Sequence, residues 1–136
     1  MSVATGSADK TVRTWNLREY RQEIEFKGHT ESIYSIKFID KKKLLASGGY
    51  DKTVIIWRLS DKTQYAILRG HIHLIKKVLA TDDGRFVLSC DIFEGIRVWN
   101  VDEKLQEYVL QFQEQALNWL GQNKVQLESI KRYLKE

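Results

Sequence analysis

A repeat of 42 residues constrains the fold of this chain more than any other feature. Trp15, Trp57 and Trp99 stand 42 residues apart, and each lies near the end of a segment of similar sequence: TVRTWNL, TVIIWRL and GIRVWNV. Two further pairs keep the same spacing: Gly28-His29 with Gly70-His71, and Asp9 with Asp51. A constant spacing over three copies indicates one structural unit that is used three times.

Each unit divides into four short segments with the composition of β-strands, separated by turn residues. In the middle unit these segments are Ile33–Ile39, Leu44–Gly48, Thr53–Leu59 and Gln64–Arg69. The third of them is apolar on both faces, which is typical of a strand in a sheet that is packed between two others. A four-stranded sheet that recurs about every 42 residues predicts the blade of a β-propeller.

The motifs of these units resemble the WD-repeat (β-transducin-type) propeller family over residues 2–112. The shared pattern is a Gly-His pair, a serine in the second strand, a turn aspartate and a tryptophan six residues after it. The resemblance implies that the polar side chains form a structural hydrogen-bond network in each blade. The expected members are His29, Ser47, Asp51 and Trp57 in the middle unit, His71, Ser89 and Trp99 in the third, and Thr5, Asp9 and Trp15 in the first. The third unit has Phe93 at the aspartate position, and the first has no histidine.

The fold class that follows is all-β: a partial WD-repeat propeller of about 2.75 four-stranded blades, which is not closed. The expected blades are residues 2–26 (partial), 32–69 and 74–112. A closed propeller has about 4–8 blades, so eleven strands cannot complete a ring. Three explanations stay open: a piece of a longer protein, which we favour, a ring completed by further copies or other chains, or an open stack covered by a helix.

Residues 113–136 are expected to form a C-terminal amphipathic α-helix. Their apolar side chains fall on one helical face. These are Ala116, Trp119, Leu120, Leu127, Ile130 and Leu134. The helix would pack on its own propeller or in the groove of a partner.

Composition favours a soluble globular protein. Hydrophobic residues make up 43% and charged residues 29% of 136 residues, the net charge is +4, and no apolar run reaches the roughly 20 residues of a membrane span. Cys90 is the one cysteine, which excludes an internal disulfide. We therefore expect a reducing, cytoplasmic setting, with the nucleus as an alternative.

Aspartate, histidine and serine also suggest a hydrolase, but the structural network accounts for all three in the middle unit. A nucleophile would need exposure and an oxyanion site besides. His71 and His73 lack a further ligand at metal-binding spacing. We therefore expect no catalytic residue, no metal and no cofactor.

The turn tip of the third unit carries two large apolar residues, Ile92 and Phe93, where the middle unit has Tyr50-Asp51. Apolar residues at a turn tip suggest a contact surface. Tyr50, Ile92 and Phe93 are therefore candidates for a partner-binding rim. The alternative is that Phe93 folds inward over the space left by the missing aspartate.

The function expected from these observations is a non-catalytic protein–protein interaction scaffold within a larger propeller or complex. Its partners would be other proteins or peptides, or a second chain that completes the ring. Two alternatives remain: a regulatory module of a larger enzyme, and a nucleic-acid-associated subunit that uses the net positive charge of the repeat region, which includes the basic run Lys41–Lys43. That run lacks interleaved aromatic residues and a second basic cluster nearby, which makes nucleic acid a weaker candidate.

Overall fold

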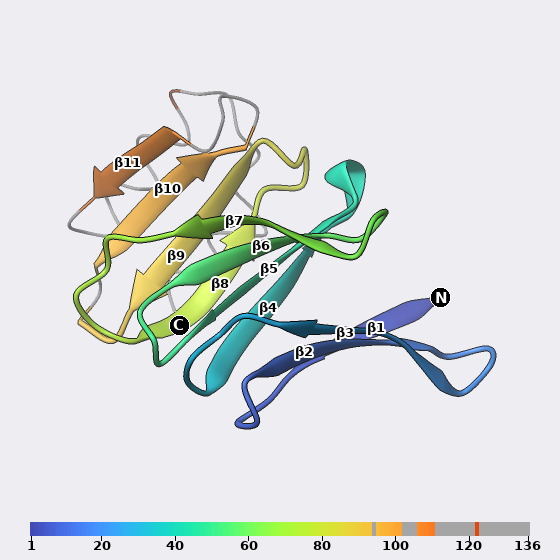
Figure 1. The fold of residues 1–136 in the computed structure, drawn as a ribbon. Coiled ribbons are helices and arrows are strands. Elements are labelled where there is room, and N and C mark those ends of the chain that lie inside the picture. The colour runs from blue at the N-terminus through green and yellow to red at the C-terminus, as the bar shows by residue number, and fades with distance from the viewer. Residues whose placement is uncertain (94, 102–105, 111–121, 123–136) are drawn as a thin grey trace.

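The computed structural model of the chain describes residues 1–93, 95–101, 106–110 and 122. These residues form three antiparallel sheets and one short 3-10 helix (Figure 1). The first sheet contains β1 (Ser2–Gly6), β2 (Thr11–Asn16) and β3 (Arg21–Lys27). The second contains β4 (Ile33–Ile39), β5 (Leu44–Gly49), β6 (Val54–Arg58) and β7 (Thr63–Leu68), with the helix η1 (Asp40–Lys42) between β4 and β5. The third contains β8 (Ile75–Ala80), β9 (Phe86–Asp91), β10 (Ile96–Asn100) and β11 (Gln106–Leu110).

The described part of the chain confirms the all-β prediction and the three unclosed sheets. The sheets have three, four and four strands, and within each sheet the strands pair in sequence order. In the middle sheet the strand ends differ from the predicted ones by at most one residue. The helix predicted at 113–136 lies outside the described residues. Within the described residues, no helix is long and apolar enough to cross a membrane.

The three sheets follow one another in chain order and stand side by side without closing a ring (Figure 1). Their contacts run along the inner strands, where β1 lies against β4 and β4 lies against β8. Two glycines allow this close approach. A Cβ on Gly6 would lie 2.6 Å from Cγ2 of Ile33, and a Cβ on Gly48, its counterpart in the next sheet, would lie 2.8 Å from Cγ2 of Ile75. Glycine at these positions therefore lets adjacent sheets pack face to face.

Apolar side chains fill the space between the first and second sheets. Trp57 is 1% exposed and its ring lies 4.9 Å from the ring of Phe26, centroid to centroid. The other buried members of this cluster are Val12, Ile33, Leu45 and Ile55. Burying one such side chain contributes about 1.5–3 kcal/mol, so this layer holds the two sheets together.

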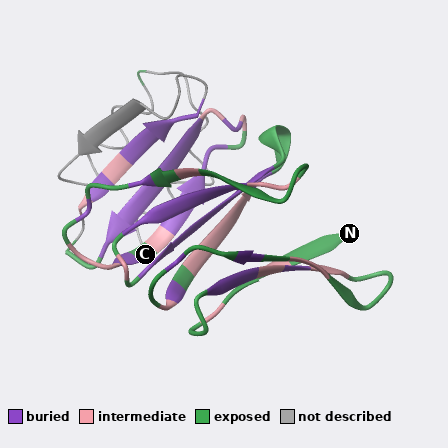
Figure 2. Cartoon of the chain, viewed as in Figure 1, coloured by how far each residue is buried: buried purple, intermediate pink, exposed green. Residues whose placement is uncertain are grey.

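A second apolar layer lies between the middle and third sheets. Both sheets contribute side chains to this layer: Ile39, Ala46 and Ile56 come from the middle sheet, and Val78 and Trp99 come from the third sheet. The middle sheet is therefore covered on both faces, as the apolar sequence of its third strand predicts. Figure 2 shows this difference, because β5, β6 and β9 are almost entirely buried while much of β1 and β3 is exposed.

Candidate functional site

The middle sheet contains a chain of four hydrogen-bonded side chains. His29 precedes β4, Ser47 lies on β5, Asp51 lies in the turn after β5, and Trp57 lies on β6. Nδ1 of His29 lies 2.8 Å from Oδ2 of Asp51, and Nε2 of His29 lies 2.6 Å from Oγ of Ser47. The indole Nε1–H of Trp57 donates to the same Oγ at 2.8 Å. The four residues that the motif predicts are thus brought together.

The direction of these hydrogen bonds is set by the indole, which can only donate. Since Oγ of Ser47 accepts from Trp57, its own hydroxyl proton is free to donate to Nε2 of His29. Nδ1 of His29 then carries the proton that faces the carboxylate of Asp51. Each polar group has a hydrogen-bond partner in the next residue, so the four side chains join β5, β6 and the segment before β4.

Asp51 also holds the turn in which it lies. Its Oδ1 accepts from the backbone N–H and the hydroxyl of Thr53 at 3.2 and 2.8 Å, and Oδ2 accepts from the N–H of Thr30 at 3.0 Å. Lys52, between Asp51 and Thr53, has a φ of 66°, in the left-handed region. Burial alone raises the pKa of Asp51, but the hydrogen bonds from His29 and Thr53 outweigh it and the pKa is lowered. Asp51 is therefore an ionised acceptor at neutral pH.

The third sheet has a complete network as well, which corrects the expectation that its aspartate is missing. Nδ1 of His71 lies 3.1 Å from Oδ2 of Asp91, and Nε2 lies 2.7 Å from Oγ of Ser89. Nε1–H of Trp99 donates to that Oγ at 3.1 Å. Burial lowers the pKa of His71, which keeps the imidazole neutral beside the carboxylate. Asp91 stands two positions before Phe93, the residue that the 42-residue spacing aligns with Asp51.

Asp91 reaches the histidine because the turn that follows it has a different shape. Oδ1 of Asp91 accepts from the N–H groups of Phe93 and Gly95, each at 2.9 Å. A Cβ on Gly95 would lie 2.4 Å from Oδ2 of Asp91, so only glycine leaves room for the carboxylate. The sequence signal for this turn was an aspartate at the end of a strand with a glycine four residues later. Phe93 is 69% exposed, so the alternative that it folds inward is wrong.

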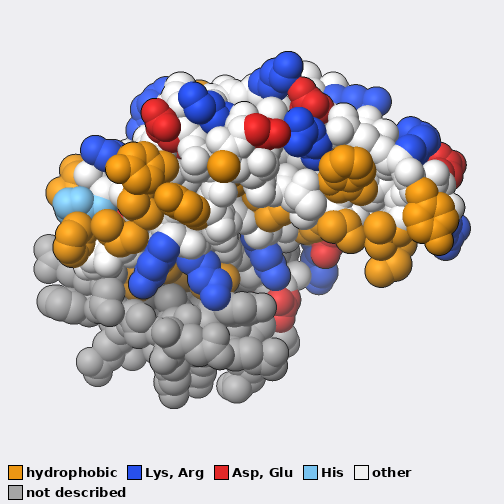
Figure 3. Space-filling view, turned by 90° about the horizontal axis from the view of Figure 1, so that it is seen from below, with side chains coloured by type: hydrophobic (Ala, Val, Ile, Leu, Met, Phe, Trp, Pro, Cys, Tyr) orange, Lys and Arg blue, Asp and Glu red, His pale blue; other side chains and the backbone are white. Residues whose placement is uncertain are grey.

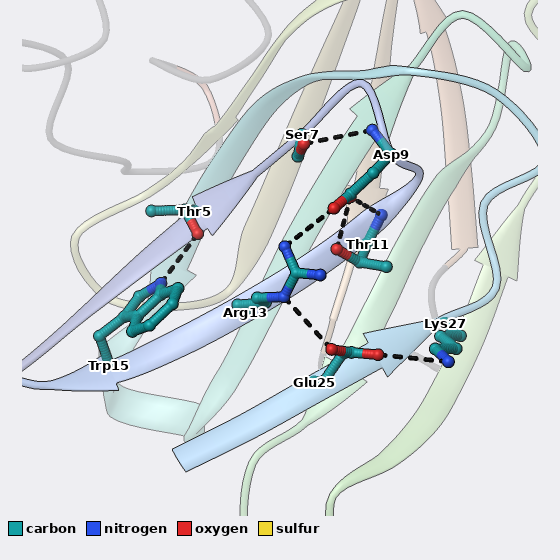
Figure 4. A network of polar contacts seen from close by, with 8 residues as sticks. All are labelled: Thr5, Ser7, Asp9, Thr11, Arg13, Trp15, Glu25 and Lys27. Atoms are coloured by element: carbon teal, nitrogen blue, oxygen red, sulfur yellow. Dashed lines mark hydrogen bonds and ion pairs between the residues drawn. The ribbon is translucent and has the colours of Figure 1, made fainter. Parts of the chain in front are cut away.

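In the described part of the first sheet, an arginine lies beside the turn aspartate (Figure 4). Oγ1 of Thr5 accepts from Nε1–H of Trp15 at 3.0 Å, as serine does in the other sheets. Oδ2 of Asp9 accepts from Nη1 of Arg13 at 2.9 Å, and Nε of Arg13 donates to Glu25 at 3.2 Å. Hydrogen bonds from Thr11 lower the pKa of Asp9 well below its usual range. These groups are exposed, so the ion pairs add little to stability.

The geometry of the networks does not favour catalysis. Ser47 and Ser89 are both 0% exposed, and each already accepts from a tryptophan and donates to a histidine. Burial raises the pKa of the Cys90 thiol to about 11, which keeps it protonated. In the described part of the chain, no group of His, Cys, Asp and Glu side chains could hold a metal ion. The polar networks hold strands together rather than presenting a reactive group to solvent.

Exposed aromatic and apolar side chains gather on the turns at one end of the sheets. Tyr50 is 52% exposed, Ile92 is 44% exposed and Phe93 is 69% exposed. The ring of Tyr34 lies 6.4 Å from that of Tyr50, and the ring of His73 lies 4.4 Å from that of Phe93. Figure 3, seen from below Figure 1, shows hydrophobic side chains beside a histidine on this side of the molecule. We call the surface formed by Tyr34 of β4 and the connecting residues Tyr50, Ile72, His73, Ile92 and Phe93 the aromatic rim.

Comparison with known proteins agrees with the geometry of the middle sheet. The family model for the WD domain, G-beta repeat, matches residues 20–58, which include the whole network from His29 to Trp57. No curated protein matches the chain. WD domains are in general interaction modules that bind other proteins and are typically without catalytic activity. The matched repeat stands between two sheets built on the same pattern, so residues 20–58 are similar to a WD repeat in both sequence and structure.

Proposed function

We propose that this chain is a non-catalytic scaffold that binds a partner protein or peptide through the aromatic rim. The observation that carries the proposal is the exposure of large apolar side chains on turns that the buried networks hold in place. Phe93, at 69% exposed, stands on the turn that Asp91 fixes through two backbone hydrogen bonds. Tyr50 precedes Asp51, whose carboxylate fixes the neighbouring turn.

Rigid turns favour binding because little conformational entropy is lost when a partner docks. Aromatic residues are also the side chains that contribute most to protein interfaces. Exposed single apolar residues are common on protein surfaces, but here they include two ring contacts, Tyr34 with Tyr50 and His73 with Phe93. We infer that a partner packs apolar side chains against the aromatic rim. The polar backbone of the turns surrounds this apolar contact.

The test compares the aromatic rim with the opposite end of the sheets. A triple variant, Tyr50→Ala, Ile92→Ala and Phe93→Ala, removes rim side chains that are exposed. The control is Tyr20→Ala with Tyr65→Ala. Tyr20, at 93% exposed, lies on the turn between β2 and β3, and Tyr65 lies on β7. Partners captured from cell extract are then compared by quantitative mass spectrometry.

The proposal expects a set of proteins that the wild-type chain and the control variant retain and the rim variant loses. A photo-crosslinking residue in place of Phe93 should reach the same proteins, and one in place of Tyr20 should not. Equal capture by the rim variant and the wild type, with both folded, would remove the proposal.

A further inference from the structure

The layer between the first and second sheets contains a pocket of about 230 Å³. Its lining side chains come from β1, β2, β3 and β4 and from the residue that follows β6: Ser2, Thr14, Glu23, Ile24, Phe38 and Leu59. Glu23 and Leu59 are half-buried, so the pocket reaches solvent at that end, while Thr14 is buried. The pocket thus runs from the surface into the layer that holds the two sheets together.

The repeat shows which side chains stand at the same positions in the layer between the middle and third sheets. Ser2, Thr14 and Glu23 precede Leu44, Ile56 and Tyr65 by 42 residues each. Leu44 and Ile56 are buried members of the apolar layer against the third sheet. The first sheet therefore carries hydrogen-bonding side chains at three positions where the middle sheet has apolar or aromatic ones. The polar character of the pocket is written in the sequence of this unit.

The hydroxyl of Thr14 is buried and has no hydrogen-bond partner among the described residues. Thr14 is 3% exposed. It pairs with Ala4 and Ile24 on the neighbouring strands, and both of these side chains pack in the layer against the second sheet. Side chains that lie directly opposite one another point to the same face of a sheet, so Thr14 also points into this layer. Buried hydroxyls nearly always have a partner, and a molecule bound in the pocket would supply one.

A β-bulge brings Glu23 to the same pocket. Thr14 lies opposite Ile24 and Trp15 lies opposite Gln22, so Glu23 is the extra residue of β3. A bulge changes the direction of the side chain that it carries. Oε2 of Glu23 accepts from the hydroxyl of Ser2 at 3.2 Å, and Oε1 accepts from Nδ2 of Asn16 at 3.1 Å. These two hydrogen bonds hold the carboxylate at the pocket.

The charge of Glu23 is not balanced by a cation in the described part of the chain. Glu25, on the same strand, forms ion pairs with Arg13 and Lys27. The partners of Glu23 are the neutral side chains of Ser2 and Asn16. A carboxylate can accept about four hydrogen bonds, so that of Glu23 can accept further ones from a cationic donor.

The lining side chains fit one chemical class of ligand. The carboxylate of Glu23 and the hydroxyl of Thr14 accept from N–H groups, while the apolar walls suit an aliphatic chain. One carboxylate and one hydroxyl are too few oxygen ligands for a calcium ion, which takes about six to eight. A primary ammonium on a four-carbon chain has five non-hydrogen atoms, which need roughly 150 Å³ at about 30 Å³ each. The pocket has room for such a group.

We propose that this pocket binds a primary alkylammonium group. The ammonium donates to the carboxylate of Glu23 and to the hydroxyl of Thr14, and its aliphatic chain lies between Ile24, Phe38 and Leu59. The group belongs either to a free amine or to a lysine side chain of a polypeptide. The pocket contains no residue of the aromatic rim, so the proposal is independent of the function proposed above.

The test titrates the full 136-residue chain, labelled with ¹⁵N, with butylammonium chloride and records the amide signals by NMR. The signals of Thr14 and Ile24 should shift saturably, with a Kd on the order of 1 mM for so small a ligand. Butanol has the same aliphatic chain without the charge, so it should bind at least tenfold more weakly. Sodium chloride at equal concentration is the control for ionic strength.

Two variants assign the polar contacts. Glu23→Gln removes the charge and keeps the shape, so it should weaken butylammonium binding at least tenfold. The matched control, Glu31→Gln, changes an exposed glutamate outside the pocket and should leave the Kd unchanged. Thr14→Val replaces the hydroxyl by a methyl group of similar size. It should weaken binding and also raise the Tm of the unliganded chain, because it removes a buried hydroxyl without a partner.

A second probe identifies the source of the ammonium group. Nα-acetyl-lysine methylamide carries the same four-carbon chain and ammonium on a peptide backbone. Binding at least as tight as that of butylammonium would assign the pocket to a lysine side chain of a polypeptide. Binding of butylammonium alone would assign it to a free amine. Either result agrees with the proposal.

Three results would each overturn the proposal. One is the absence of a saturable shift at Thr14 and Ile24 in the folded wild-type chain, which would mean that the pocket holds water alone. Another is equal binding of butanol and butylammonium, which would make the pocket an apolar cavity. The third is butylammonium binding that Glu23→Gln leaves unchanged.

Discussion

Nδ1 of His71 lies 3.1 Å from Oδ2 of Asp91, although Asp91 stands two positions earlier in its unit than Asp51 does in the middle unit. The third sheet therefore keeps the interaction while its sequence departs from the repeat. A buried carboxylate that accepts from the histidine is retained, because the imidazole Nδ1–H would otherwise lack an acceptor.

Removing either carboxylate should destabilise the chain by a similar amount. Asp51→Ala and Asp91→Ala each leave a buried imidazole N–H and several turn N–H groups without an acceptor. We expect the free energy of unfolding to fall by about 2 kcal/mol in each variant, measured by urea denaturation. Asp40→Ala, at an exposed position, is the control and should change it by less than about 0.5 kcal/mol. A loss confined to Asp51→Ala would show that Asp91 does not hold His71.

Placing an aspartate at the position that the repeat aligns should not stabilise the third sheet. Since Asp91 already supplies the carboxylate, Phe93→Asp should change the free energy of unfolding by less than about 0.5 kcal/mol. Thermal or urea unfolding measures this directly. A clear stabilisation would mean that Nδ1–H of His71 had no acceptor in the native chain.

The free energy of unfolding should decrease as the pH falls, in two ranges. Burial lowers the pKa of His71 below 6.5, so its contribution is complete above that pH and is lost as the pH falls through the lower folded value. The pKa values of Asp51 and Asp91 are lowered from 3.8 despite burial, because His29 and the Gly95 amide, among others, donate to them. Their contribution is present above about pH 4 and is lost below it.

Urea unfolding between pH 8 and pH 3 measures this profile. In His71→Gln the decrease that begins near pH 6.5 should become smaller, while the decrease below pH 4 should persist. An unchanged profile in that variant would contradict the assignment of the upper range to His71.

Cys90 should be unreactive in the folded chain. Its side chain is buried, and burial raises the pKa of the thiol to about 11, so little thiolate exists at pH 8. We expect iodoacetamide to modify Cys90 only at the rate at which the chain unfolds. Mass spectrometry with and without urea gives this comparison, and rapid alkylation of the native chain would contradict the burial of β9.

Much of the fold could be predicted because the repeat carries its own register. The spacing of Trp57 to Ser47 and Asp51 places the first two on neighbouring strands of one blade and Asp51 in the turn between those strands, and the strand limits follow from it. The spacing could not reveal Asp91, because a turn can change shape while the strands on either side keep their positions. Residues aligned by number at a turn therefore need not be equivalent in space.

The aromatic rim could be predicted only in part for a related reason. Ile92 and Phe93 stand out in sequence because they break the repeat. Tyr34 does not, and it lies beside Tyr50 because the pairing of β4 with β5 shifts register between Ile33 and Ser35. A bulge of this kind turns a side chain outward, and the 42-residue spacing does not change to reveal it. In the first sheet, Arg13 donates to Asp9, and the spacing does not reveal this contact because Arg13 is not part of the shared motif.

Exchange of the tryptophan indole protons, followed by NMR in deuterated water, tests the central claim that the repeated polar residues are internal supports of the sheets. Trp57 and Trp99 are 1% and 4% exposed and donate to buried serines, so their indole protons should exchange slowly. Trp15 is half-buried and donates to Thr5, so its indole proton should exchange much faster. Rapid exchange at Trp57 and Trp99 in the folded chain would show that the networks are open to solvent, and would contradict the account.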